Sequence, residues 1–158
     1  MERAEMGARE YFERIRDDGR DLARRRLRAQ EMREQLGSHG QRYGSVGGGG
    51  SHDATGALTH VIAYEEEIER DEVLHLIEVG QATEILYGRS GRGGLAKRRG
   101  SVDADIICCH YLQGMTYAAI AEDVARPESD SPVDWCRQRA HRALGYIDRV
   151  GVATLTDS

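Results

Sequence analysis

The pattern of apolar and polar positions is clearest in the C-terminal third of the chain. Apolar residues between Asp103 and Gln113 predict one helix, which Gly114 ends in the position that glycine usually takes after a helix. Thr116 then caps a second, short helix. The apolar residues of this second helix recur at i, i+3, i+4 and i+7, the spacing of one helical face: Tyr117, Ile120, Ala121 and Val124.

A third helix is predicted from Ser131 onward, because a serine N-cap followed by proline is typical of a helix start. Its apolar face consists of Val133, Cys136, Ala140, Ala143, Leu144 and Ile147. Helical spacing puts polar and aromatic residues on and beside the opposite face: Asp134, Trp135, Gln138, Arg139, His141 and Arg142. We therefore expect a three-helix domain over residues 102–150, in which the second and third helices form a helix-turn-helix.

A long charged helix is predicted over residues 1–36. Ile15, Leu22, Ala29 and Leu36 repeat every seven residues and form a thin apolar seam along it. Two interpretations fit this seam. The helix is either a solvated helix laid on another helix or one strand of a coiled coil.

Residues 37–56 are rich in glycine and have the composition of a flexible linker. A nucleotide-binding loop is not indicated, because no strand precedes the glycines and no Lys-Ser/Thr pair follows them. Residues 57–87 predict a second long helix that is apolar on one side and acidic on the other. Together the two long helices suggest a coiled-coil-like helical hairpin, formed within one chain or across a homodimer.

Residues 88–101 form a basic, glycine-rich segment that we expect to be a mobile loop. From Arg89 to Arg99 it holds five basic residues and no acidic one. Its role is either a tether that follows DNA phosphates, with Arg98 and Arg99 as contacts, or a plain soluble linker. Residues 151–158 carry no strong pattern and are assigned as a tail.

Composition narrows the class of protein. The 158 residues are 39% hydrophobic and carry a net charge of −5, which by itself disfavours nucleic acid. The third predicted helix nevertheless has four arginines against two aspartates, and DNA binding depends on the local basic face. The three cysteines lack C-x-x-C spacing and are expected to be reduced, packed residues of a cytoplasmic protein. No apolar run approaches the length of a membrane span.

Catalytic and metal-binding patterns are not indicated. No Ser/His/Asp or Cys/His arrangement can be argued from the sequence. His110, His141, Cys109 and Cys136 match no zinc spacing, and both cysteines occupy positions where packed apolar residues belong. We expect neither an enzyme nor a cofactor.

Two stretches of the C-terminal third resemble a known family. HYLQGMTYAAIAEDV resembles the first half of region 4 of sigma-70-type factors, where an apolar helix is followed by Gly, an apolar residue, Ser/Thr-Tyr and Ile-Ala. CRQRAHRAL resembles the second half, where a small apolar residue precedes Arg-x-x-Arg-Ala. The chain departs from that pattern at His110, where Arg is common, and at residues 125–130, where the family has a tight turn with Gly. The layout of the whole chain is also similar to phage late-gene transcriptional regulators of the RinA and ArpU type.

The resemblance implies an all-α, sequence-specific DNA-binding transcriptional regulator, encoded by a phage or prophage and acting in the cytoplasm of a bacterial host. Its partners would be double-stranded DNA and RNA polymerase. The third helix would enter the major groove, with Gln138 and Arg139 at base edges and Arg142 at a base or the far phosphate. Thr116 and Ser131, at helix N-termini, would face phosphate. Trp135 would either pack on the turn before its helix or contact a thymine methyl or sugar, with Asp134 and His141 beside it.

Two other function classes fit the sequence. One is a protein-interaction module that docks on RNA polymerase, since region 4-like folds also do this. The other is a small terminase-like DNA-packaging subunit, which likewise joins a helix-turn-helix to an oligomerising helix. Ring-shaped oligomers would favour the packaging subunit, and salt-sensitive binding to one promoter would favour the regulator.

Overall fold

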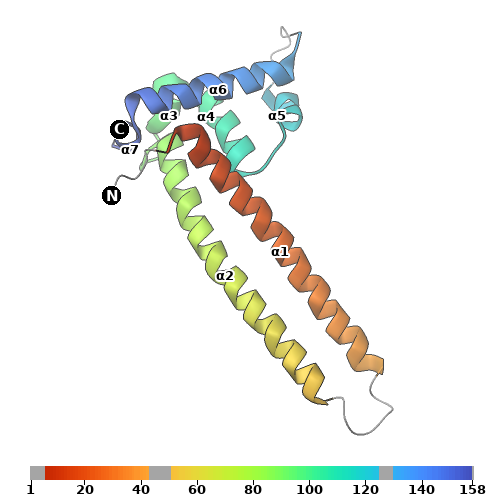
Figure 1. Ribbon diagram of the computed structural model, residues 1–158. Helices are drawn as coiled ribbons and strands as arrows, with labels where there is room; N and C mark the ends of the chain where they lie inside the picture. The colour runs from red at the N-terminus through yellow and green to blue at the C-terminus, as the bar shows by residue number, and fades with distance from the viewer. Residues whose placement is uncertain (1–5, 43–50, 125–129, 158) are drawn as a thin grey trace. The chain divides into compact units, whose positions relative to one another are not determined.

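Every regular element of the chain is a helix over the residues that the computed structural model describes, which are 6–42, 51–124 and 130–157 (Figure 1). The all-α class predicted from the sequence is therefore confirmed, as is the N-terminal helical hairpin. The two hairpin helices are α1 (Ala8–Arg42) and α2 (Ser51–Tyr87). They contribute to two compact units: a hairpin unit, residues 20–75, and a core unit, residues 6–19 and 76–157.

Both hairpin helices are longer than the sequence pattern predicts. α1 continues to residue 42 instead of ending at 36, and α2 begins at residue 51 instead of 57. The predicted linker, residues 37–56, was wrong at both ends, and what remains of it, residues 43–50, lies outside the described residues. The physical reason is that a glycine inside a helix costs only about 1 kcal/mol relative to alanine, so a few glycines do not end one.

The hairpin unit is held by a thin seam with ion pairs along it. Leu22 and Ala29, two of the predicted heptad positions, are buried there with Ile68, whereas Leu36 is only half-buried. Among the described residues of the hairpin unit, three ion pairs join the two helices: Arg25–Asp71 at 2.7 Å, Arg26–Glu72 at 2.6 Å and Arg33–Glu65 at 2.5 Å. The hairpin thus forms within one chain. Each exposed pair contributes at most about 1 kcal/mol, so the hairpin unit is a lightly stabilised pairing.

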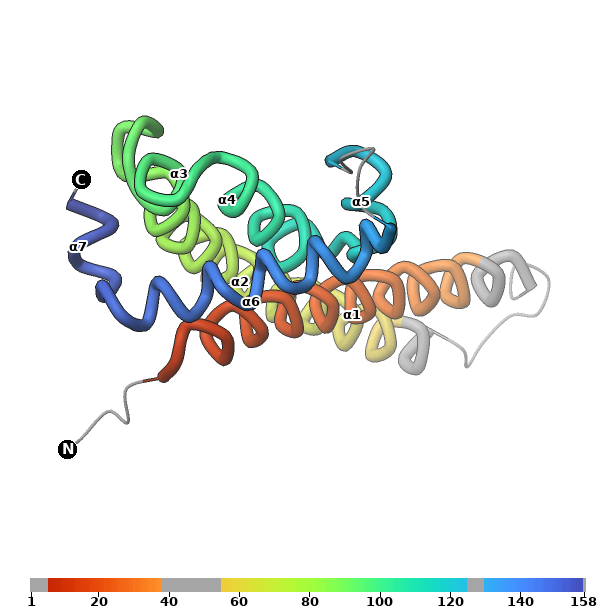
Figure 2. The backbone as a smooth tube through the Cα atoms, turned by 90° about the horizontal axis from the view of Figure 1, so that it is seen from above, coloured from red at the N-terminus to blue at the C-terminus, as the bar shows by residue number. Residues whose placement is uncertain are grey.

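The core unit surrounds one apolar cluster to which all its long elements contribute. Phe12 and Ile15 enter it from the first turns of α1, and Leu86 enters from the end of α2; all three side chains are fully buried. The largest share comes from α4 (Ser101–Ile107) and α6 (Pro132–Val150), which pack on each other. Figure 2 shows α6 crossing over α4 and over the first turns of α1.

The basic, glycine-rich segment is ordered, which corrects the expectation of a mobile loop over residues 88–101. It folds into α3 (Gly94–Arg99), which packs against α4 and α7. Two features hold it. Leu95 is fully buried in the core cluster, and the Gly93 backbone N–H donates to the Tyr87 carbonyl at 2.8 Å. Gly94 has φ +65°, and a Cβ there would lie 2.6–2.7 Å from the backbone of residues 85–88.

The three predicted C-terminal helices are present, with one change of geometry. The first runs through α4 into a π-helix, η1 (Cys108–Leu112), in which the Gln113 N–H donates to the Cys108 carbonyl. The second is α5 (Tyr117–Val124), which buries Ile120 and Ala121 as expected. The third is α6, which starts directly after Ser131 and buries Cys136, Ala140, Ala143, Leu144 and Ile147. Residues 125–129, most of the predicted turn insertion, lie outside the described residues.

The assignment of residues 151–158 as a tail was incorrect, because this segment contains a further helix. α7 (Val152–Thr156) follows Gly151, and its Leu155 is fully buried in the core cluster. Three apolar residues within an eight-residue segment, Val152, Ala153 and Leu155, are too few to show a periodicity from which a helix can be predicted. The packing of Leu155 beside α3 and α6 therefore decides the structure of this end.

Gly94 and Gly80 give a test of the α2–α3 corner. Gly94→Ala should lower the free energy of unfolding by about 2–4 kcal/mol, because the methyl group meets backbone atoms that cannot move aside and φ is positive. Gly80→Ala is the matched control, since Gly80 lies in α2 with open space at its Cβ. It should raise the free energy of unfolding by up to about 1 kcal/mol. Urea unfolding followed by far-ultraviolet circular dichroism measures both, and equal effects would contradict the tight corner.

Candidate nucleic-acid interface

One face of α6 is exposed along most of the helix. Gln138, Arg142 and Arg149 are all exposed, and Gly145 between them is exposed as well. Steps of four and seven residues keep these side chains within a narrow stripe, because seven residues make almost two full turns. The stripe lies opposite the buried face that begins at Cys136. We call Gln138, Arg142, Gly145 and Arg149 the outer stripe of α6.

Beside this stripe, a buried carboxylate holds two arginines. Asp103 of α4 is 1% exposed, and Arg99 Nε donates to its Oδ2 at 3.0 Å. Arg139 Nε of α6 lies 2.7 Å from its Oδ1. This second contact is an ion pair and not a hydrogen bond, because the Arg139 N–H does not point at the oxygen and neither atom has another hydrogen-bond partner. The Arg99–Asp103–Arg139 triad therefore ties α3, α4 and α6 together by charge.

The structure places Arg139 differently from the sequence prediction, which put it at base edges. Its guanidinium turns toward Asp103 and lies over the Trp135 ring, 5.2 Å from the ring centroid. Trp135 is half-buried and packs on the core cluster, whereas most of the turn on which it was predicted to pack lies outside the described residues. Sequence spacing put Arg139 near the outer face, but only the tertiary structure shows the buried acid that attracts it.

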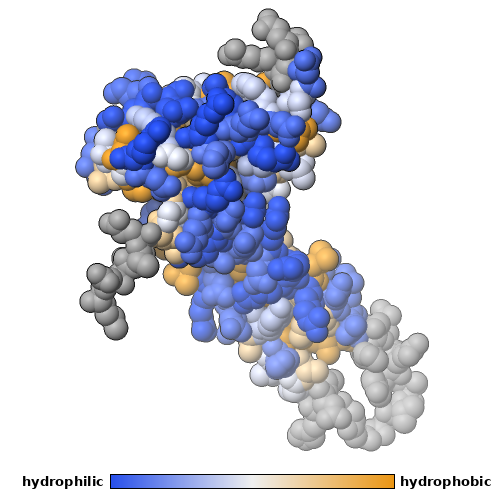
Figure 3. All heavy atoms as spheres, turned by 45° about the horizontal axis from the view of Figure 1, so that its top comes forward, coloured by the Kyte–Doolittle hydropathy of each residue, from blue (hydrophilic) through white to orange (hydrophobic). Residues whose placement is uncertain are grey.

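Tyr146 connects α3 to the outer stripe. Its ring lies between two guanidiniums, that of Arg99 at 5.3 Å and that of Arg149 at 5.9 Å from the centroid. Lys97 and Arg98 of α3 are exposed. Tyr146 thus links α3, which carries Lys97 and Arg98, to the outer stripe through Arg99 and Arg149, and the surface of the core unit that faces the viewer in Figure 3 is mainly hydrophilic.

Lys97 and Arg149 complete this surface and were not among the predicted contacts. Arg149 could have been found, because it lies seven residues after Arg142 and so shares its helical face. Lys97 could have been found as well, because it stands directly before Arg98 in the same basic segment.

The residues at the helix N-termini make local contacts. Thr116 Oγ1 accepts a hydrogen bond from the Ala119 N–H at 3.2 Å and so caps α5 as predicted. Ser131 stands at the N-cap of α6, but its hydroxyl donates to Asp134 Oδ2 at 2.9 Å instead of accepting from the backbone. Asp134 in turn pairs with Arg137 at 2.7 Å. Asp134 therefore carries a local polar network at the start of α6.

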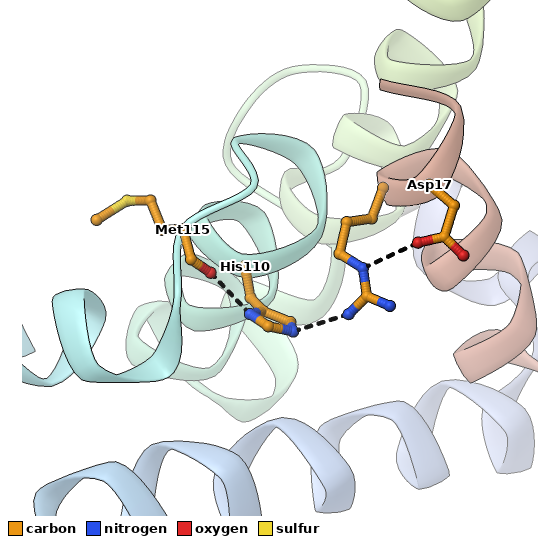
Figure 4. A network of polar contacts seen from close by, with 4 residues as sticks. Asp17, His110 and Met115 are labelled. Atoms are coloured by element: carbon orange, nitrogen blue, oxygen red, sulfur yellow. Dashed lines mark hydrogen bonds and ion pairs between the residues drawn. The ribbon is translucent and has the colours of Figure 1, made fainter. Parts of the chain in front are cut away.

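The histidines join α1 to the helix-turn-helix region. On the exposed side of α6, Arg9 Nη2 lies 2.6 Å from His141 Nδ1. The buried His110 ring stacks on Tyr117, with centroids 3.9 Å apart. Figure 4 shows His110 between the Met115 carbonyl and the Arg16 guanidinium, which also contacts Asp17.

The two partners of His110 fix its tautomer. The carbonyl of Met115 can only accept, so His110 Nδ1, 2.8 Å away, carries the proton and donates. Nε2 then accepts from Arg16 Nη1 at 3.1 Å. His110 thus fastens η1 to α1.

Asp148, near the end of α6, joins that helix to the start of α1 in the same unit. Its Oδ1 accepts a hydrogen bond from the Ala8 backbone N–H at 2.7 Å and so caps α1 from across the fold. It also lines a cavity of about 810 Å³, whose walls come from the first turns of α1, the end of α2, the end of α6, and α7.

The chemistry of the cysteines is that of packed thiols. Burial raises the pKa of the Cys136 thiol, and burial followed by the nearby carboxylate of Asp105 raises that of Cys109. Both groups therefore stay protonated at neutral pH, and the protonated thiol is a poor nucleophile and metal ligand. Within residues 6–42, 51–124 and 130–157, no group of three or more His, Cys, Asp or Glu side chains is placed to hold a metal ion.

Comparisons of this chain with protein-family models, with curated proteins and with solved structures found no match. None of the helices in the described part of the chain is both long and apolar enough to cross a membrane.

The triad predicts a specific loss of stability. Asp103→Asn removes the charge but keeps the shape, and leaves two guanidiniums facing each other without a counterion. We expect the free energy of unfolding to fall by about 3 kcal/mol, the usual cost of breaking a buried ion pair on one side. Asp123→Asn removes a charge from an exposed position of α5 and should change the value by less than about 0.5 kcal/mol. Thermal unfolding of both variants at low salt measures the difference, and comparable melting temperatures for the two would show that the triad contributes little.

Proposed function

We propose that this protein is a sequence-specific, double-stranded DNA-binding regulator of transcription, with α6 as its recognition helix. The observation that carries the proposal is the outer stripe of α6. Gln138 and Arg142 stay exposed on the stripe, while Arg139, on its flank, is held by a buried acid. An amide and a guanidinium one turn apart are the groups that read adenine and guanine edges in the major groove.

The surface beside the stripe suits the phosphate backbone. Lys97 and Arg98 on α3 and Arg149 at the end of α6 are exposed cations on elements that Tyr146 links. Such contacts give affinity without sequence preference, and they make binding sensitive to salt. The global charge of −5 does not oppose this, because many acids lie on α2.

The sigma-like residues support the same proposal from another direction. The helices that carry them, α5 and α6, pack on each other as the two helices of a helix-turn-helix do. By that resemblance we extend the proposal to a regulator of a phage or prophage that acts on a promoter in its bacterial host. Docking on RNA polymerase without reading DNA is the competing function, and the experiment below separates the two.

The recognition assignment predicts two kinds of loss. Gln138→Ala should weaken binding to the preferred site by roughly 1–3 kcal/mol and relax the sequence preference at one base pair. Replacing Lys97 and Arg98 together by Ala should weaken binding to all sequences alike and reduce the slope of log K against log salt by about 2. Arg99 is left intact in this variant because it holds Asp103.

The measurement is a fluorescence-anisotropy titration of each variant against a selected duplex and a scrambled one, at two salt concentrations. Arg70→Ala, which removes an exposed cation from the hairpin unit, is the control for loss of charge alone. If Gln138→Ala binds both duplexes as the parent does, α6 is not the recognition helix. In that case a parent chain that captures RNA polymerase but ignores DNA would establish the interaction module instead.

A further inference from the structure

The exposed apolar side chains gather on the hairpin. Of the large hydrophobic residues that are exposed, five belong to the hairpin unit: Leu27, Leu58, Ile62, Val73 and Leu74. Leu27 is 60% exposed and Val73 is 58% exposed. Single exposed apolar side chains are ordinary, whereas a contiguous group of them is informative. Figure 3 shows hydrophobic residues, in orange, at the surface of the hairpin among hydrophilic ones, in blue. Among the described residues of the same unit, the buried apolar side chains form a thin seam of Leu22, Ala29, Val61 and Ile68.

Most of these residues lie along one flank of the hairpin. On α2, Leu58, Ile62, Glu69 and Val73 are spaced so that they share a face about a quarter turn from the buried seam of Val61 and Ile68. On α1, the exposed residues Ala23, Leu27 and Gln30 follow one another at steps of four and three and also lie about a quarter turn from its seam. Because the helices are antiparallel and both right-handed, the two faces point to the same side. We call these residues the apolar flank.

We propose that the apolar flank is the surface through which two copies of this chain pair, side by side, into an antiparallel four-helix bundle. The intrachain ion pairs fix which residues are level along the hairpin. Arg25 lies level with Asp71, and Arg26 lies level with Glu72. Because the helices are antiparallel, Ala23 is therefore level with Val73. In the same way, Leu27 is level with the residues next to Glu69. A two-fold axis along the hairpin preserves these levels and lays α1 of one copy on α2 of the other.

Charge selects this pairing over the alternative. In a pair that lays α2 on α2 in opposite directions, the exposed acids near the middle of the flank, Glu66 and Glu69, would face their own copies. In the α1-on-α2 pair, Glu69 instead lies near the uncharged Leu27 and Gln30 of the second copy, and Gln30 has an amide that can donate to it. Of the two arrangements, the α1-on-α2 pair is the one that gives Glu69 an uncharged neighbourhood, which is why a second copy in that arrangement fits the flank. This inference does not depend on the proposed DNA binding.

Oligomeric state and single substitutions test the proposal. Sedimentation velocity of the full chain over a range of concentrations should give the mass of two chains. Leu27→Lys and Val73→Lys, at exposed positions that leave the fold intact, should each move the dimer–monomer midpoint at least about tenfold higher in concentration. Leu74→Lys is the matched control, because Leu74 is equally exposed but lies a further 100° around the helix from Val73. It should leave the midpoint unchanged.

Disulfide trapping tests the register of the pair. Chains with Ala23→Cys are mixed with chains carrying Val73→Cys and oxidised, so that any bond between these two positions must join two copies. We expect a covalent dimer in the mixture and none above the parent background with Val73→Cys alone. A monomer at all concentrations, a mass above two chains, equal effects of Val73→Lys and Leu74→Lys, or efficient trapping with Val73→Cys alone would each overturn the proposal.

Discussion

The core unit depends on one buried charge, the carboxylate of Asp103. It is almost inaccessible to solvent and is neutralised by Arg99 from α3 and by Arg139 from α6. The two guanidiniums continue outward onto Tyr146 and Trp135, so a single acid fixes the positions of two aromatic rings as well. A buried carboxylate tolerates few alternative placements, because losing either partner would leave it uncompensated. It therefore holds the outer stripe of α6 in one orientation.

The hairpin unit, in contrast, is not held by a buried charge within its described residues. It has a narrow seam, exposed ion pairs and apolar side chains that face water. Such a pairing gains little from its own burial, because two helices alone cannot enclose a wide core. A second copy laid on the apolar flank would supply the missing burial. DNA-binding regulators with a helix-turn-helix commonly pair about a two-fold axis, so the two proposals are compatible although each stands on its own observations.

Several predictions from sequence failed for one shared reason. Glycines and charged residues were interpreted from their neighbours in the sequence, without the distant residues that they contact in the fold. Residues 88–101 were expected to be mobile because five cations stand among glycines. In the structure, however, the backbone packs closely at Gly94, and Leu95 is buried in the core. The ends of the predicted linker are helical for the same reason. Arg139 looked free because it stands beside a polar face. Its actual partner is 36 residues earlier in the chain, and no short-range pattern indicates it.

The sequence by itself determined the two long helices and the three predicted C-terminal ones, because the 3.6-residue period and the helix-start residues Thr116 and Ser131 are local properties. It also determined which face of α6 is buried, and therefore that Gln138 and Arg142 lie outward. Only the tertiary structure decided which cations remain exposed, because that depends on Asp103 reaching α6 from another helix. The same holds for α3 and α7, whose six and five residues are too short to form stable helices alone and are helical because Leu95 and Leu155 are buried in the common core.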